Sequence, residues 1–222
     1  LAKYGTPFTP LNHYAPWNVD DDGKVITLDD TLDGEHRTGL EVLLDGLFNA
    51  ERFLQIIRDY TAFDNTTKGL VKRIAKPHQY FAVSNAVAST IAAVKSNGKA
   101  GVVWHTQGSG KSMEMELYTA RVIRHPALLN PTIVVITDRT ELDGQLFDTF
   151  SQSELLPEKP VQVKRRSDLR EALTERLTGG IYFTTLQKFG RTDDERAAGL
   201  DPPLLSDWRN TIVIVDEAPR SH

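Results

Sequence analysis

The sequence of 222 residues contains no cysteine. This absence excludes disulfides and thiolate metal sites, and it is typical of a cytoplasmic protein. The chain also lacks any run of eighteen apolar residues, so we expect neither a membrane-spanning helix nor a membrane partner. An excess of basic residues is missing too. The net charge of −4 argues against tight binding to nucleic acid by electrostatics alone, because phosphate contacts need Lys and Arg.

Charge is unevenly distributed along the chain. Residues 1–63 carry five Lys or Arg against eleven Asp or Glu, whereas residues 64–99 carry six against one. This shift predicts a boundary near Asp64, between an acidic connector of residues 1–63 and a larger domain of residues 64–222. Prolines and glycines predict extended chain as far as about Thr38. A helix capped by Asn49 should follow, because apolar residues recur at helical spacing at Phe53, Ile56, Ile57 and Tyr60.

Residues 18–29 match the twelve-residue pattern of a calcium-binding loop. Pro16 disfavours a helix entering that loop, and Asp29 is one methylene shorter than the usual bidentate Glu. We therefore interpret Asp22-Gly23 as a β-turn between short strands.

A lysine and a hydroxyl follow two glycines in residues 105–112, His-Thr-Gln-Gly-Ser-Gly-Lys-Ser. Gly108 and Gly110 would let backbone amides approach phosphate oxygens. Lys111 would reach the β and γ phosphates, and Ser112 would offer its hydroxyl to Mg²⁺. The sequence therefore predicts an ATP-binding loop, with Thr106, Gln107 and Ser109 as further members, rather than a surface turn. His105 replaces the first glycine of the longer form of this motif, so only the shorter form is matched, and His105 could either pack at a strand end or approach the nucleotide.

An acidic pair stands near the end of the chain. Residues 211–215 are a β-branched run typical of a parallel strand buried on both faces, and Asp216-Glu217 follows directly. We expect Asp216 to hold Mg²⁺ and Glu217 to orient and deprotonate the attacking water. The alternative is two solvated acids after an edge strand.

Apolar runs and helical segments alternate from Gly101 onward. The runs are 101–104, 132–136, 161–163, 180–184 and 211–215, and the helical candidates are 110–124, 140–150 and 167–178. This order predicts an α/β fold with a parallel sheet whose ligand site lies at the carboxyl ends of the strands. Thr140-Glu141-Leu142-Asp143 is typical of a capping box that opens the second of these helices.

Five strings in this order resemble the restriction subunit of type I restriction enzymes, a DNA-translocating ATPase of helicase superfamily 2. They occupy residues 76–83, 105–112, 132–142, 182–189 and 215–220. The resemblance runs from roughly residue 40 to the end. It implies a P-loop NTPase fold, the first RecA-like helicase lobe with an incomplete parallel sheet, preceded by a mostly helical connecting segment.

The resemblance also implies roles for single residues. Gln79, in a helix expected over 77–98, would read the adenine. Contacts to a DNA strand are implied for Thr137, Asp138, Arg139 and Thr185. One departure concerns Pro219, which stands where the family has a histidine after Asp-Glu-Ala. The implied partners are duplex DNA and the methyltransferase and specificity subunits of a type I complex.

The start at Leu1 and the early end after Pro219 indicate a fragment that is incomplete at its carboxyl end. Three hypotheses follow: the ATP-binding part of a type I restriction motor, a helicase or remodelling motor of another system, or a nucleotide-binding fragment without hydrolysis. Because an arginine finger from a second lobe is missing, we expect ATP binding with little turnover, and we expect no nuclease site.

Overall fold

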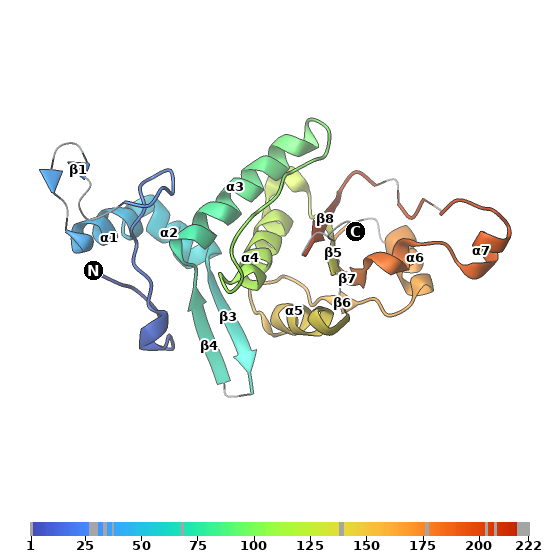
Figure 1. The fold of residues 1–222 in the computed structure, drawn as a ribbon, viewed down its shortest axis with the longest axis horizontal. Helices are drawn as coiled ribbons and strands as arrows, with labels where there is room; N and C mark the ends of the chain where they lie inside the picture. Colours follow the sequence, from blue (N-terminus) through green and yellow to red (C-terminus); the bar gives the residue numbers. More distant parts are fainter. Residues whose placement is uncertain are drawn as a thin grey trace. The chain divides into compact units, whose positions relative to one another are not determined.

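The computed structural model describes residues 2–26, 31–32, 35–36, 38–67, 69–137, 140–175, 178–202, 204–206 and 208–216 (Figure 1). The chain divides into two compact units. Unit 1 comprises residues 1–121 with 152–155, and unit 2 comprises residues 122–151 with 156–222. None of the described helices is long and apolar enough to cross a membrane.

Unit 1 combines short helices with two antiparallel hairpins. Its elements are η1 (Leu11–His13), β1 (Thr31–Leu32), β2 (Glu35–His36), α1 (Gly39–Leu47), α2 (Ala50–Asp59), β3 (Thr61–Thr66), β4 (Gly69–Ile74), α3 (Pro77–Val94) and most of α4 (Lys111–Arg124). The β3–β4 hairpin pairs Thr61 with Ile74 and Asp64 with Val71. The boundary predicted near Asp64 therefore falls inside a hydrogen-bonded strand, and no pattern in the sequence predicted this hairpin.

The amino-terminal segment packs into unit 1 through an aromatic group. Trp17 is buried, and the Arg52 guanidinium lies 5.4 Å from the centroid of its ring. A Cβ atom at Gly46 would lie 2.2 Å from Trp17 Cδ1, so α1 can approach the indole only because this helix position is glycine. The Tyr4 hydroxyl donates to the Ala75 carbonyl at 2.7 Å. The segment predicted as extended chain is thus tied to α1, α2 and the start of α3.

Two local predictions in unit 1 are confirmed. Asn49 caps α2, since its Oδ1 accepts a hydrogen bond from the Arg52 amide at 3.3 Å. A turn joins the bridge partners Val19 and Val25, and Gly23 adopts φ +82° within it. This left-handed conformation explains the glycine after aspartate.

Unit 2 carries a four-stranded parallel sheet in the order β6-β7-β5-β8. Its elements are η2 (Pro126–Leu128), β5 (Thr132–Thr137), α5 (Thr140–Gln152), β6 (Val161–Gln162), α6 (Arg166–Glu175), β7 (Ile181–Thr185), η3 (Leu186–Phe189), α7 (Asp193–Ala197) and β8 (Thr211–Val215). The predicted α/β class is confirmed. The α5 helix begins at Thr140, as expected, but the side chains of its proposed capping box lie outside the described residues.

The inner strands β5 and β7 are covered on both faces. Val134 and Tyr182 are neighbours in the register and form one apolar cluster with Leu169 of α6. Successive side chains of a strand point to opposite faces. On the other face, the Phe183 ring meets the ring of Phe150, in α5, with centroids 5.0 Å apart. Burial on both faces explains why β5 is a continuous apolar run. The prediction that residues 211–215 are buried on both faces is wrong, because β8 is an edge strand in which Val213 and Val215 are 54% and 50% exposed.

One predicted strand is wrong. Residues 101–104 form no strand, and the side chains of Val102 and Trp104 are 89% and 90% exposed. A strand needs a partner that satisfies its backbone groups, and no described strand pairs with this run. Gly101 adopts φ +124°, which is incompatible with a regular strand.

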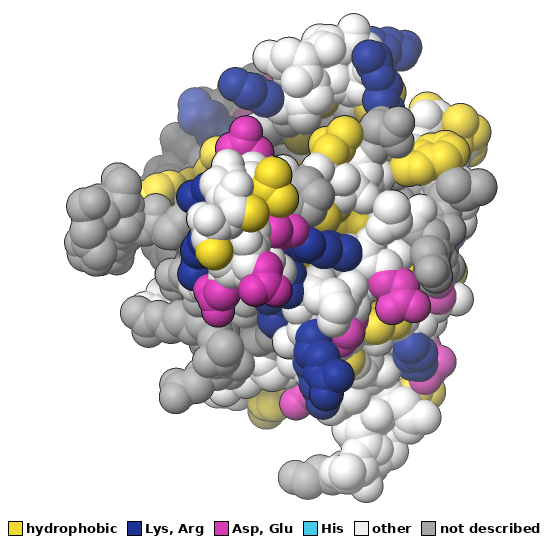
Figure 2. Space-filling view, turned by 90° about the vertical axis from the view of Figure 1, so that its right-hand side faces the viewer, with side chains coloured by type: hydrophobic (Ala, Val, Ile, Leu, Met, Phe, Trp, Pro, Cys, Tyr) yellow, Lys and Arg dark blue, Asp and Glu magenta, His cyan; other side chains and the backbone are white. Residues whose placement is uncertain are grey.

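Charged side chains of both signs are mixed on the surface. Figure 2 shows Lys and Arg side chains as well as Asp and Glu side chains on the same face. This pattern agrees with the net charge of −4.

Candidate nucleotide-binding site

The loop before α4 has the backbone conformation that its glycines permit. Gly108 adopts φ +81° and Gly110 adopts φ +90°, a region that residues with a side chain rarely enter. A Cβ atom at Gly110 would lie 2.5 Å from Gln79 Nε2, whereas one at Gly108 would meet nothing within 4 Å. Glycine therefore suits the backbone conformation at both positions, and at Gly110 it also leaves room for the Gln79 carboxamide in its observed place.

Backbone amides are available where the loop enters the helix. The Gly110 carbonyl accepts from the amides of Met113 and Glu114, at 3.0 and 3.2 Å, which starts α4. The described residues offer no hydrogen-bond acceptor to the amides of Gly108, Gly110, Lys111 and Ser112. Amides at the positive end of a helix dipole bind anions, so this turn is suited to phosphate oxygens.

Gln79 braces the loop from the start of α3. Its buried carboxamide accepts a hydrogen bond from the Lys76 amide at 2.8 Å, which caps the helix. Its Nε2 donates to the carbonyls of Ser109 and Gly110, both at 3.3 Å. The expected contact with adenine stays a prediction, and Oε1 retains a second lone pair that could accept from the base.

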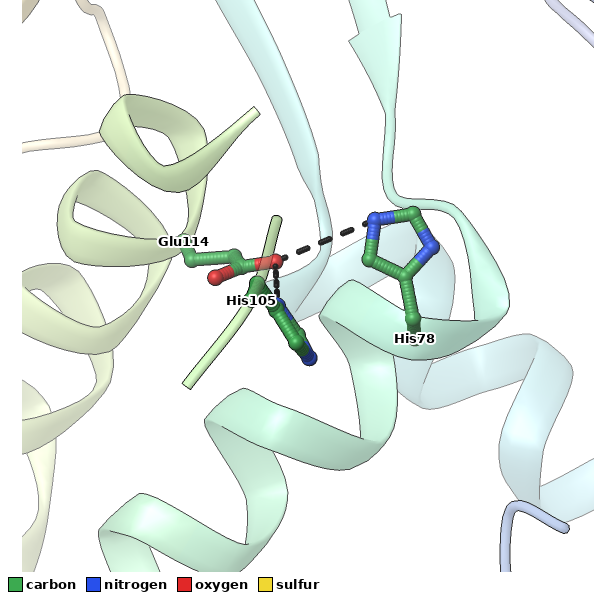
Figure 3. Close-up of side chains that lie close together, drawn as sticks. All are labelled: His78, His105 and Glu114. Atoms are coloured by element: carbon green, nitrogen blue, oxygen red, sulfur yellow. Dashed lines mark hydrogen bonds and ion pairs between the residues drawn. The ribbon is translucent and has the colours of Figure 1, made fainter. Parts of the chain in front are cut away.

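Two histidines and a carboxylate meet beside the loop (Figure 3). His105 Nδ1 lies 2.7 Å from Glu114 Oε1, and His78 Nε2 lies 3.9 Å from the same oxygen. His78 comes from α3, His105 from the loop and Glu114 from α4. Sequence reasoning missed this cluster because its members are separated by 27 and 9 positions, which do not suggest a shared site.

A buried ion-pair network holds α4 to the hairpin. Arg73, in β4, lies 2.6 Å from the buried Glu116 carboxylate and also pairs with Asp64 of β3. Burial raises the pKa of Glu116, and the Arg73 charge opposes that shift. Burial lowers the pKa of Arg73, but hydrogen bonds and attraction to both carboxylates more than offset it and leave that pKa raised. The hairpin thereby fixes the second turn of α4, directly after Lys111 and Ser112.

In unit 2, three predicted residues meet at the carboxyl edge of the sheet. Thr137 and Thr185 are register partners, and the Asp216 amide donates to the Ile136 carbonyl at 2.9 Å. The side chains of both threonines are buried. Their contact with DNA stays a prediction, as does magnesium binding by Asp216. The remaining predicted residues, Asp138, Arg139 and Glu217, lie outside the described residues, as does Pro219.

A family model described as SWI2/SNF2 ATPase matches residues 78–222, more than half of the chain. The chain belongs to the SWI2/SNF2 ATPase family. The matched region begins at His78 and contains the loop, the amide turn and Asp216. The sequence of this SWI2/SNF2 ATPase is also similar to longer proteins that are named as endonuclease subunits of type I restriction enzymes.

Two of these relatives align with the whole chain. The type I restriction enzyme HindI endonuclease subunit of Haemophilus influenzae is 42% identical, and the chain covers 20% of it. A putative type I restriction enzyme MjaIXP endonuclease subunit of Methanocaldococcus jannaschii is 35% identical, with 21% of it covered. The SWI2/SNF2 ATPase chain thus spans about a fifth of the length of these relatives.

Proposed function

We propose that this chain is the ATP-binding part of the DNA-translocating motor of a type I restriction endonuclease, acting in the cytoplasm. The observation that carries the proposal is the turn of amides at the start of α4, which the described residues leave without acceptors. The names of the relatives support the restriction system. Hydrolysis of ATP would drive movement along duplex DNA before cleavage, in a complex with methyltransferase and specificity subunits.

Phosphate binding is assigned to the loop of residues 105–112. Its amides would hold phosphate oxygens, and Lys111, in the first turn of α4, would add the cationic contact. Ser112 and Asp216 offer a hydroxyl and a carboxylate, the hard oxygen ligands that Mg²⁺ prefers. When bound, this ion would neutralise phosphate charge. Gln79 would contact the base.

The first test is a Lys111→Ala variant. Because it removes a charge-assisted contact worth about 1.5–3 kcal/mol, the Kd for Mg-ATP should rise roughly 10- to 150-fold. Calorimetric titration of the 222-residue chain measures this change. The matched control is Lys99→Ala, which removes an exposed lysine outside the loop and should leave the Kd unchanged. Equal affinities for both variants would contradict the phosphate-loop assignment.

A second test separates binding from turnover. We propose Glu217 as the group that orients the attacking water, and we expect the chain alone to hydrolyse ATP slowly, because an arginine finger from another lobe adds about 10³- to 10⁵-fold in rate. Phosphate release is measured with and without duplex DNA. Brisk DNA-stimulated turnover that Glu217→Gln abolishes would overturn the expectation of slow hydrolysis. If the unaltered chain binds no ATP, the proposed function itself is wrong.

A further inference from the structure

The side chains of His78, His105 and Glu114 are not among the groups that we propose to bind phosphate. Two imidazoles and one carboxylate are a ligand set that zinc sites use when three ligands come from the protein and the fourth position stays open. The three ligand atoms lie within 4.8 Å of one another. All three residues belong to unit 1.

The buried carboxylate makes the cluster unusual. The Glu114 side chain is 7% exposed, and among the described residues its carboxylate pairs with His105 and His78 and forms no ion pair with a Lys or Arg. A buried charge is stable only when a partner or a metal ion compensates it. A neutral imidazole supplies a hydrogen bond but no charge, whereas a divalent cation would supply both compensation and a bond.

The distances suit a zinc ion after small side-chain rotations. Bonds of about 2.0–2.1 Å in tetrahedral geometry separate two ligand atoms by about 3.3–3.4 Å. Glu114 Oε1 is 2.7 Å from His105 Nδ1 and 3.9 Å from His78 Nε2. Each distance differs from the tetrahedral separation by about 0.6 Å, in opposite directions. The partly exposed ring of His78 leaves the remaining position open to water.

We propose that His78, His105 and Glu114 form a binding site for a divalent transition metal ion, with Zn²⁺ as the ion expected. Imidazole ligands disfavour Mg²⁺, which prefers oxygen, and none of these three residues is among those proposed to hold the magnesium ion. The ion would join α3, the loop and α4. It would thus fix the entrance of the phosphate loop.

Occupancy would change one contact of the loop. His78 Nε2 is 3.0 Å from the Ser109 carbonyl, a bond for which this nitrogen must carry a proton. A nitrogen bound to zinc carries no proton, so His78 would release Ser109. The Gln79 amide, 3.3 Å from the same carbonyl, would remain as its donor. Metal binding should therefore be visible in the ¹³C chemical shift of this carbonyl.

Calorimetric titration of the metal-free 222-residue chain with ZnCl₂ tests the proposal. We expect one zinc ion per chain. In His105→Ala and Glu114→Gln the affinity for zinc should fall by at least about 100-fold, because losing a residue that only hydrogen-bonds to a metal ligand already lowers metal affinity about 10- to 100-fold. His13→Ala, which removes an exposed histidine outside the cluster, is the matched control and should bind normally. Circular dichroism confirms that each variant is folded.

A spectroscopic measurement on the unaltered chain does not depend on the folding of variants. With one equivalent of zinc, X-ray absorption should show two imidazole ligands, and the Ser109 carbonyl shift should move. A first shell made only of oxygen, unchanged affinity in both cluster variants, or loss of binding in His13→Ala would overturn the proposal. Because the titration contains no nucleotide, a failure here is distinguishable from a failure of the ATP-binding proposal.

Discussion

Replacing Gly110 with alanine should destabilise the protein more than the same change at Gly108. Both glycines have positive φ, +90° and +81°, so each alanine takes on a strain of about 1–2 kcal/mol. Only at Gly110 would the new Cβ meet another group, Gln79 Nε2 at 2.5 Å. Displacing that carboxamide removes two hydrogen bonds of 3.3 Å to loop carbonyls, which are worth roughly 0.5–1.5 kcal/mol each. The expected total is about 2–5 kcal/mol for Gly110→Ala.

Urea unfolding followed by circular dichroism provides the free energies. Gly98→Ala is the control outside the loop, because Gly98 has φ +77° and open space around it. A double-mutant cycle isolates the clash: in a Gln79→Ala background, the extra loss at Gly110 over Gly108 should disappear. Equal losses for Gly110→Ala and Gly108→Ala in the unaltered background would refute the claim that Gln79 braces the loop.

Two further predictions concern ion pairs. Arg73→Met should lower the free energy of unfolding by about 3–5 kcal/mol at neutral pH, because it leaves the buried Glu116 carboxylate without its cation. Since burial already raises the pKa of Glu116, this loss of stability should shrink as the pH falls toward 4.5. Urea unfolding over a series of pH values measures the loss, and a loss that does not change with pH would contradict this explanation. Hydrogen bonds from Arg170 and the Thr192 amide lower the pKa of Glu195 to about 2, so the stability it adds is fully present above pH 4.5 and lost as pH falls toward 2. A carboxyl ¹³C NMR titration should give that midpoint, and Arg170→Met should move it upward; no change in the variant would contradict the pairing.

Features that depend on neighbouring residues could be predicted from the amino-acid sequence. The apolar runs of 132–136 and 211–215 predicted strands, and both strands form, as β5 and β8. The burial predicted for both faces of 211–215 is wrong, because β8 lies at the edge of the sheet. Asn49 predicted a helix cap, since a short polar side chain satisfies an amide only three positions away. The resemblance to a family was identifiable as well, because the motifs that carry it are short contiguous segments of sequence that can be recognised without the fold.

Features that depend on contacts between distant segments became visible only in the folded chain. The run 101–104 has the composition of a strand but no described partner, and strand formation requires one. The contact of Gln79 with the base stays a prediction from the resemblance, and its role as a brace for the loop, 30 positions away, was visible only in the fold. The cluster of His78, His105 and Glu114 could likewise not be predicted from the sequence. The spacing of residues indicates which side chains share a face of one helix or strand, but not which distant segments come into contact.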